Sequence, residues 1–175
     1  MDLLDLFERA SAWSASKIPP ASQLSTPSDC DGWDVRTLID HMIETQRFFT
    51  ASARGEQPAM PSPTPPAATG DDAAGAYDTA RAETIRAFSE PGVIEKTGPS
   101  LGIAFTDQLV HGWDLARSTG QDATIPSDLA EAAFSMIDGK LTDEFRDRAG
   151  FKPAIEVPAS ASAQDRLLAY TGRQP

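Results

Sequence analysis

The sequence predicts an all-α fold, a four-helix bundle with one or two additional short helices. Three observations favour this fold class. Apolar residues recur at helical spacing in several separate segments of the chain. No segment alternates apolar and polar residues for long enough to indicate a strand. No period of roughly 20 to 50 residues repeats, which argues against a repeat architecture.

Three helices are expected in the first half of the chain. Residues 2–18 carry apolar side chains at helical spacing, and a pair of prolines ends this helix. A second amphipathic helix is expected over 35–52, with Asp34 as its N-cap. Residues 71–90 form the third, which a Pro-Gly pair ends.

One side of the second helix is expected to face solvent, because it carries Arg36, Asp40 and Arg47. The segment 56–69 that follows this helix is rich in proline and indicates a loop or an extended arm. It is long for a structureless connection in a compact domain. We therefore expect it to pack over something or to be partly mobile.

The second half begins with a turn containing Gly and Pro at 93–100, followed by a helix that ends at Thr119. Another amphipathic helix is expected over 126–141. Residues 150–158 have an extended pattern. A Ser-x-x-Asp capping box then begins a short last helix over 162–170.

Length and composition suit a soluble globular protein. The 175 residues fit one domain, and 40% apolar and 23% charged residues are ordinary values. The net charge is −11 and the basic residues are scattered, so we expect no nucleic-acid and no membrane partner. No apolar run approaches the roughly 20 residues that span a bilayer, and the N-terminus is acidic, so we expect a cytoplasmic protein.

The segment 101–116 is apolar on nearly every side of a helix, yet it carries polar groups in one narrow sector. These groups are Asp107, His111 and Asp114. Burying unpaired carboxylates costs several kcal/mol each. The sector therefore requires a cation, a hydrogen-bond network or a metal as its partner.

A metal, if present, would be bound by histidine and carboxylate, because the sequence contains one cysteine, Cys30, and two histidines, His41 and His111. Asp107 and His111 stand four residues apart and can reach one ion. His41 would approach from the second helix. Three such ligands leave a coordination position open, as in catalytic zinc sites and in the facial triad of non-haem iron enzymes.

Residue types alone leave other interpretations open. Asp107 could simply pair with His111, or with an arginine such as Arg36 or Arg81. Glu44 is a competing ligand, which we rank lower because it leans toward the polar side of its helix. The segment by itself therefore indicates either a metal site or a buried ion pair.

Four further residues are not predicted to be metal ligands or nucleophiles. Asp114 is more typical of an acid that supports a metal ligand, or of a structural acid, than of a metal ligand itself. Trp113 and Trp33 are candidates for the core or for the wall of a pocket. Cys30 suits a small buried residue better than a nucleophile. Phosphate-binding loops, dinucleotide fingerprints and the G-x-S-x-G motif are absent from the sequence.

Three stretches together resemble the metal-binding N-terminal domain of the mycothiol-dependent maleylpyruvate isomerases, in the DinB-like superfamily. They are Cys30-Asp-Gly-Trp-Asp-Val-Arg-Thr-Leu-Ile-Asp-His41, Asp107-Gln-Leu-Val-His-Gly-Trp-Asp-Leu-Ala-Arg-Ser-Thr-Gly120 and Gln164-Asp-Arg-Leu-Leu-Ala-Tyr-Thr-Gly-Arg173. The resemblance implies a DinB-like four-helix bundle with a divalent metal on His41, Asp107 and His111. Zinc is the first candidate, and nickel or iron are alternatives.

The isomerases have Glu where this chain has Asp107, and they have a second, C-terminal domain. We expect a single domain over residues 1–175 without that second domain.

The resemblance also implies a metal-dependent transferase or isomerase that uses a low-molecular-weight thiol such as mycothiol. The metal would lower the pKa of the thiol, which would then attack a small electrophilic molecule. A metal-dependent hydrolase and a non-catalytic metal or small-ligand binding protein are alternatives. A homodimer is compatible with a bundle of this size. No catalytic residue beyond the metal ligands is assigned.

Overall fold

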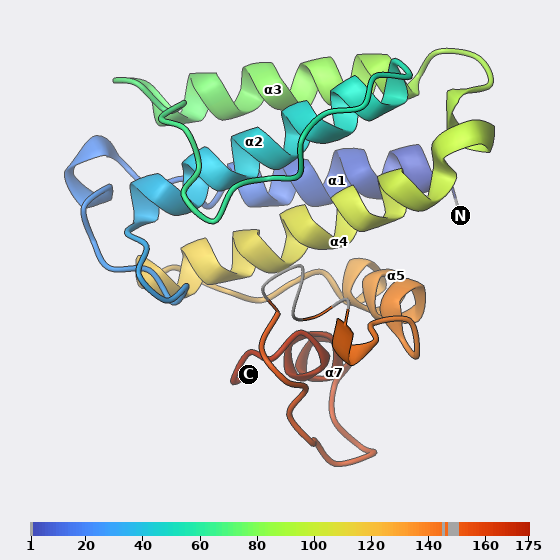
Figure 1. The fold of residues 1–175 in the computed structure, drawn as a ribbon. Helices are drawn as coiled ribbons and strands as arrows, with labels where there is room; N and C mark the ends of the chain where they lie inside the picture. Colours follow the sequence, from blue (N-terminus) through green and yellow to red (C-terminus); the bar gives the residue numbers. More distant parts are fainter. Residues whose placement is uncertain (1, 145, 147–150) are drawn as a thin grey trace. The chain divides into compact units, whose positions relative to one another are not determined.

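The computed structural model describes residues 2–144, 146 and 151–175, with the backbone alone at 98 and 99. Its regular structure is helical, apart from one isolated β-bridge between Pro27 and Asp34, so the prediction of an all-α fold is confirmed. The elements are α1 (Leu3–Ala15), the 3-10 helix η1 (Ala21–Gln23), α2 (Val35–Ala53), α3 (Ala73–Phe88), α4 (Val93–Ser118), α5 (Ser127–Ile137) and α7 (Ala163–Tyr170) (Figure 1).

The chain divides into two compact units, Met1–Ala123 and Thr124–Pro175. In the first unit α1 packs on α3 and α4, and α2 packs on the same two helices, which makes a four-helix bundle. In the second unit α5 packs on α7. The predicted bundle with additional short helices is thus confirmed, whereas one domain over 1–175 stays a prediction.

The connection between α2 and α3 is long because these two helices run in the same direction (Figure 1). A helix the length of α2 measures about 28 Å at about 1.5 Å per residue. The chain that leaves its end must therefore return over that distance before α3 begins. A proline-rich segment suits this task, because extended chain covers about 3 Å per residue.

Residues 56–69 contact α2, because the buried Asp40 on that helix binds the end of this segment. Its Oδ1 accepts hydrogen bonds from the backbone N–H groups of Ala68 and Thr69, each at 2.7 Å. The prediction that Asp40 faces solvent is wrong, since this residue is 5% exposed. Two amide donors replace the water that the carboxylate loses.

Two more side chains of α2 bind the same segment. Glu44 Oε2 accepts a hydrogen bond from the N–H of Ser62 at 3.1 Å. Arg36 Nη1 donates to Thr69 Oγ1 at 2.8 Å and to the carbonyl of Gly70 at 2.7 Å. The segment is thus an arm that packs along the polar side of α2, which is one of the two outcomes expected from its length.

The predicted caps of two helices are confirmed. Asp34 Oδ1 accepts from the N–H of Thr37 at 2.8 Å and from its hydroxyl at 2.7 Å. Burial raises the pKa of Asp34, but these hydrogen bonds and the charge of Arg36 outweigh it and lower the pKa below its ordinary value. Ser162 caps α7 in the same way, accepting from the N–H of Asp165 at 3.0 Å.

Helix α4 begins at Val93, so the turn predicted over 93–100 is wrong. The reversal occurs one residue earlier, at Gly92, which has the left-handed φ of +79°. The helix includes Pro99, which has no backbone N–H and so removes one hydrogen-bond donor from α4. Here α4 packs on α1, α2 and α3.

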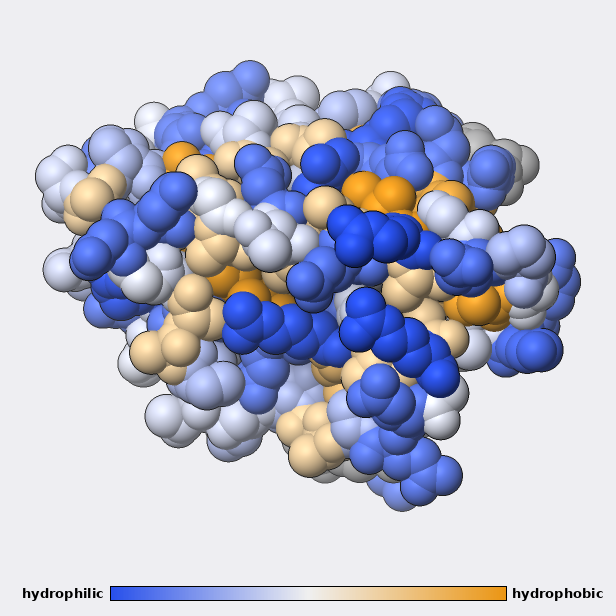
Figure 2. Space-filling model, turned by 90° about the horizontal axis from the view of Figure 1, so that it is seen from above, coloured by the Kyte–Doolittle hydropathy of each residue, from blue (hydrophilic) through white to orange (hydrophobic). Residues whose placement is uncertain are grey.

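Two further regions complete the fold. Of the extended segment predicted at 150–158, Gly150 lies outside the described residues, and 151–158 form neither helix nor strand. No helix in the described part of the chain is both long and apolar enough to cross a membrane. Figure 2 views the molecule from above Figure 1, and this face is mainly hydrophilic with small separate apolar areas.

Candidate metal centre

The position of α4 in the bundle depends on a close contact with α1 at Gly112. A Cβ atom at this glycine would lie 2.8 Å from both Ser14 Cβ and Trp13 Cζ3 on α1. Such distances are too short for a side chain, so α4 requires glycine at this position. The contact orients α4 with Asp107 and His111 on a different side of the helix.

The structure brings together the three residues predicted as metal ligands. One donor atom each of His41, Asp107 and His111 lies within 4.8 Å of the other two. The two imidazole rings meet edge to face with centroids 5.0 Å apart, and His111 Nε2 lies 3.6 Å from Asp107 Oδ1. The side chains of α2 and α4 thus converge on one point.

The carboxylate of Asp107 is oriented by two hydrogen bonds to one of its oxygens. Thr45 Oγ1 donates to Oδ2 at 3.0 Å and Gln108 Nε2 donates to the same oxygen at 3.1 Å. Gln108 is itself fixed in the core, where its Oε1 accepts from Tyr77 Oη at 2.7 Å. The other oxygen, Oδ1, is left on the side of His111.

Sequence reasoning did not assign Thr45 and Gln108 to the site, although a signal for each exists. Thr45 stands one helical turn after His41, on the same side of α2. Gln108 is a polar residue inside the apolar run of α4 and is fully buried. Buried polar side chains require hydrogen-bond partners, so both residues could have been expected beside a buried carboxylate.

His111 is held between two carboxylates. Its Nε2 is on the side of Asp107, and its Nδ1 lies 2.9 Å from Asp114 Oδ2. Burial lowers the pKa of His111, but the charge of Asp107 and the hydrogen bond to Asp114 outweigh burial and raise this pKa to about 10. In the metal-free protein His111 is therefore protonated at neutral pH, and a metal must displace a proton from it.

The competing partners considered for Asp107 and for the metal are engaged elsewhere. Glu44 binds the arm, as does Arg36. Arg81 Nε donates to Ser11 Oγ at 2.9 Å. The ion pair recorded for Asp107 among the described residues is with His111.

The two tryptophans proposed as pocket walls have different surroundings. The Trp33 ring lies with its centroid 4.9 Å from that of His41, and its Nε1 donates to the carbonyl of Pro63 at 3.1 Å. Trp33 therefore links the arm to the three converging residues. Trp113 is buried, and the guanidinium of Arg117 lies 4.8 Å from the centre of its ring.

The converging side chains fit a divalent ion. Two imidazole nitrogens and one carboxylate oxygen suit zinc, iron or nickel. Tetrahedral ligands about 2.1 Å from an ion lie about 3.4 Å from each other, and His111 Nε2 and Asp107 Oδ1 are 3.6 Å apart. The side chains of His111 and Asp107 are 13% and 19% exposed, so solvent reaches them.

A second group of potential ligands shares His111. Donor atoms of Cys30, His111 and Asp114 also lie within 4.8 Å of one another. Cys30 is half-buried, and its thiol donates to Asp114 Oδ2 at 3.5 Å. The two groups thus use opposite nitrogens of one imidazole ring.

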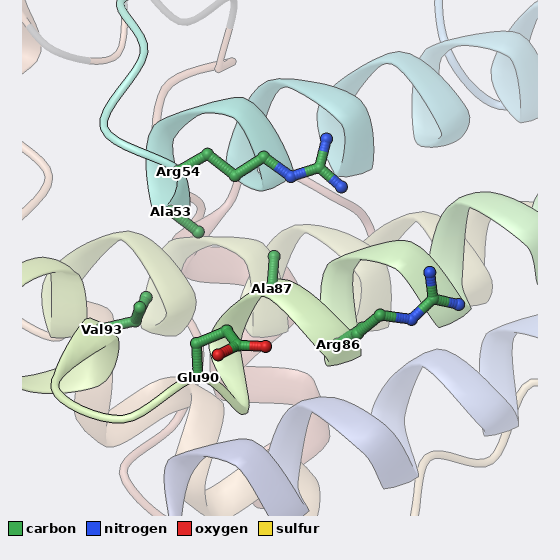
Figure 3. Close-up of a pocket in the computed structure, with 6 residues that line it drawn as sticks. All are labelled: Ala53, Arg54, Arg86, Ala87, Glu90 and Val93. Carbon is green, nitrogen blue, oxygen red and sulfur yellow. The ribbon is translucent and has the colours of Figure 1, made fainter.

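A hollow of about 340 Å³ lies at the far end of α2 and α3 (Figure 3). It is lined by Ala53, Arg54, Arg86, Ala87, Glu90 and Val93. Ala53 stands twelve residues after His41, about 18 Å along α2. The hollow is therefore separate from the converging histidines.

The fold and the site define a helical-bundle protein with a candidate metal centre. Residues 8–116 match the model of the mycothiol maleylpyruvate isomerase N-terminal domain, and the chain belongs to this family. The match includes all three converging residues. The family is metal-binding and mycothiol-related, which agrees with the ligand groups in the structure.

Two uncharacterised proteins of Mycobacterium tuberculosis are similar to the chain. They come from strains CDC 1551 / Oshkosh and ATCC 25618 / H37Rv, and each is 28% identical over 166 residues. The similarity covers 87% of this chain and 86% of each relative. No solved structure matches the chain significantly.

Proposed function

We propose that the protein binds a divalent metal and uses a low-molecular-weight thiol, such as mycothiol, to transform a small electrophilic molecule by transfer or isomerisation. The observation that carries this proposal is the convergence of His41, Asp107 and His111 from two helices within 4.8 Å. Membership of the family supports the same interpretation.

In this proposal His41, Asp107 and His111 hold the metal, with zinc as the first candidate and nickel or iron as alternatives. A divalent ion supplies a Lewis acid that lowers the pKa of a thiol. Thr45 and Gln108 keep Asp107 Oδ1 toward His111, because they bind the other oxygen. Trp33 forms a wall beside His41 for the incoming small molecule.

Partial exposure of the site favours an enzyme over a protein that merely stores a metal. A structural metal site is usually closed by four protein ligands, whereas a catalytic site keeps a position open. Three converging donors with 13% and 19% exposure at His111 and Asp107 match the second type.

The test is the zinc content of purified wild type, His41→Ala and Glu44→Gln. Glu44 is a matched control, because this carboxylate lies one turn from His41 but binds the arm. We expect one zinc per chain in wild type and in Glu44→Gln, and none in His41→Ala. Zinc that survives His41→Ala would refute the three-residue site.

A second measurement tests the thiol. Cobalt-loaded protein is titrated with mycothiol, and the visible absorption of the metal is followed. A saturable spectral change is expected. Stoichiometric metal without such a change would reject the thiol-dependent reaction while leaving the metal site, and turnover of an ester or amide substrate would then favour the hydrolase.

A further inference from the structure

We propose that Asp114 is a positioning residue that orients His111 so that its Nε2 faces the metal. The proposal rests on the proposed function, because it assigns the outer support of the same metal site. Two observations support it: Asp114 is buried, and its carboxylate contacts the ring nitrogen of His111 opposite the site.

The hydrogen bond between the two side chains decides the orientation of the ring. Asp114 is 1% exposed, and its Oδ2 lies 2.9 Å from His111 Nδ1. A carboxylate accepts and cannot donate, so Nδ1 must carry the proton of this contact. In a neutral imidazole the lone pair is then on Nε2, on the side of Asp107.

The chain also fixes Asp114 itself. Ser118 Oγ donates to the Asp114 carbonyl at 2.7 Å, and the N–H of Asp29 donates to Ser118 Oγ at 3.0 Å. The loop before α2 is thereby tied to α4, and its Cys30 thiol donates to Asp114 Oδ2 at 3.5 Å. Ser118 thus holds the backbone of Asp114, and the Cys30 thiol, a weak donor at this distance, is the one of these groups that reaches its carboxylate.

The rival explanation is a second metal site on Cys30, His111 and Asp114. One imidazole would then have to bind metal through Nδ1, which would remove the proton that Asp114 accepts. The 2.9 Å contact favours the hydrogen bond, and carboxylates commonly support metal-binding histidines in this way. Cys30 in our proposal is a donor to Asp114 and not a ligand.

The experiment compares zinc affinity by isothermal titration calorimetry in wild type, Asp114→Asn, Asp114→Ala and Cys30→Ala. Loss of an outer partner typically weakens metal binding by about 10- to 100-fold. We expect that loss for Asp114→Ala, and a smaller loss for Asp114→Asn, which keeps an acceptor oxygen. Cys30→Ala should bind zinc like wild type. Unchanged affinity in Asp114→Ala would overturn the proposal, as would an equal loss in Cys30→Ala.

A second readout separates orientation from stability. In NMR spectra the Nδ1 proton of His111 should exchange slowly with water in wild type and in Asp114→Asn, and rapidly in Asp114→Ala. Asp40→Asn, at a buried carboxylate that binds the arm, controls for general destabilisation and should keep both the slow exchange and the zinc affinity. Should Asp114→Ala fail to fold, the zinc affinity of Asp114→Asn and the proton exchange of wild type still test the role of Asp114.

The two proposals can fail separately. A wild type without zinc affinity refutes the metal site, and a slowly exchanging Nδ1 proton in that protein would still support orientation by Asp114. Rapid exchange of this proton in wild type would overturn the role of Asp114 whatever the zinc result.

Discussion

Helix α2 has polar side chains on two sides, and their surroundings differ. Toward the arm, Asp40 and Glu44 accept hydrogen bonds from backbone N–H groups. Toward α4, His41 lies beside His111 and Asp107. Both sides contain acids that are partly or fully buried, and residue types alone do not distinguish them.

The difference lies in what the charged groups face. On the arm side the backbone satisfies each carboxylate, so Asp40 and Glu44 hold a segment in place. On the α4 side one oxygen of the Asp107 carboxylate is bound to Thr45 and Gln108, and the other lies 3.6 Å from the His111 imidazole. A group of donors that converges on one point suits an ion, whereas an acid paired with amides suits a structural role.

The largest expected effect is the loss of zinc from Asp107→Asn. The amide is a poor substitute for an anionic ligand, so zinc affinity should fall by more than about 100-fold. That is the upper end of the loss expected when a residue that only supports a ligand is removed. Asp40→Asn is the matched change on the arm side. It should leave zinc affinity unchanged and lower the free energy of unfolding by about 1–3 kcal/mol, because two backbone donors lose a charged acceptor.

Calorimetric zinc titration and urea unfolding distinguish the two sides. Equal zinc affinities in Asp107→Asn and wild type would remove the contrast, and so would zinc loss in Asp40→Asn.

The second effect is a dependence of stability on pH that originates at His111. Its pKa is raised from 6.5 to about 10, so the fold favours the protonated ring. This contribution to the stability of the metal-free protein is complete below about pH 6.5 and disappears as the pH rises toward 10. Zinc affinity should rise over the same window, because the metal competes with the proton.

Urea unfolding of metal-free wild type and of His111→Gln at several pH values measures this effect. The variant should lack the decline assigned to His111. A parallel decline in both proteins would mean that other groups cause it.

The smallest effect concerns the cap of α2. Asp34→Ala removes the acceptor for the N–H of Thr37 and should cost about 1 kcal/mol of stability, the usual value for an N-cap. Ser162→Ala removes the corresponding cap of α7 and is the control. Both variants should bind zinc like wild type; a zinc affinity reduced in Asp34→Ala alone would mean that the first turn of α2 positions His41.

The sequence predicted the bundle because helical periodicity and N-caps are local signals. Asp34 and the apolar side of α2 are examples, since neither requires knowledge of the rest of the chain. The convergence of His41 with Asp107 and His111 was also within reach, because spacing limits which side chains share a helix face and the chain has two histidines.

Contacts between distant segments were not predictable from these signals. Asp40 has the sequence context of a surface acid, and its burial follows from the return of the arm over α2. The direction of α3 makes that return necessary, and no local pattern encodes it. The Pro-Gly pair did predict the break before α4, but the local pattern did not show that the next helix begins directly after Gly92.

The most direct test is X-ray absorption spectroscopy at the zinc edge of the loaded protein without added thiol. We expect two imidazole nitrogens and a carboxylate oxygen from the protein, at about 2.0–2.2 Å, and no sulfur. A sulfur at about 2.3 Å, the zinc–thiolate distance, would contradict it, because Cys30 and the opposite nitrogen of His111 would then hold the metal.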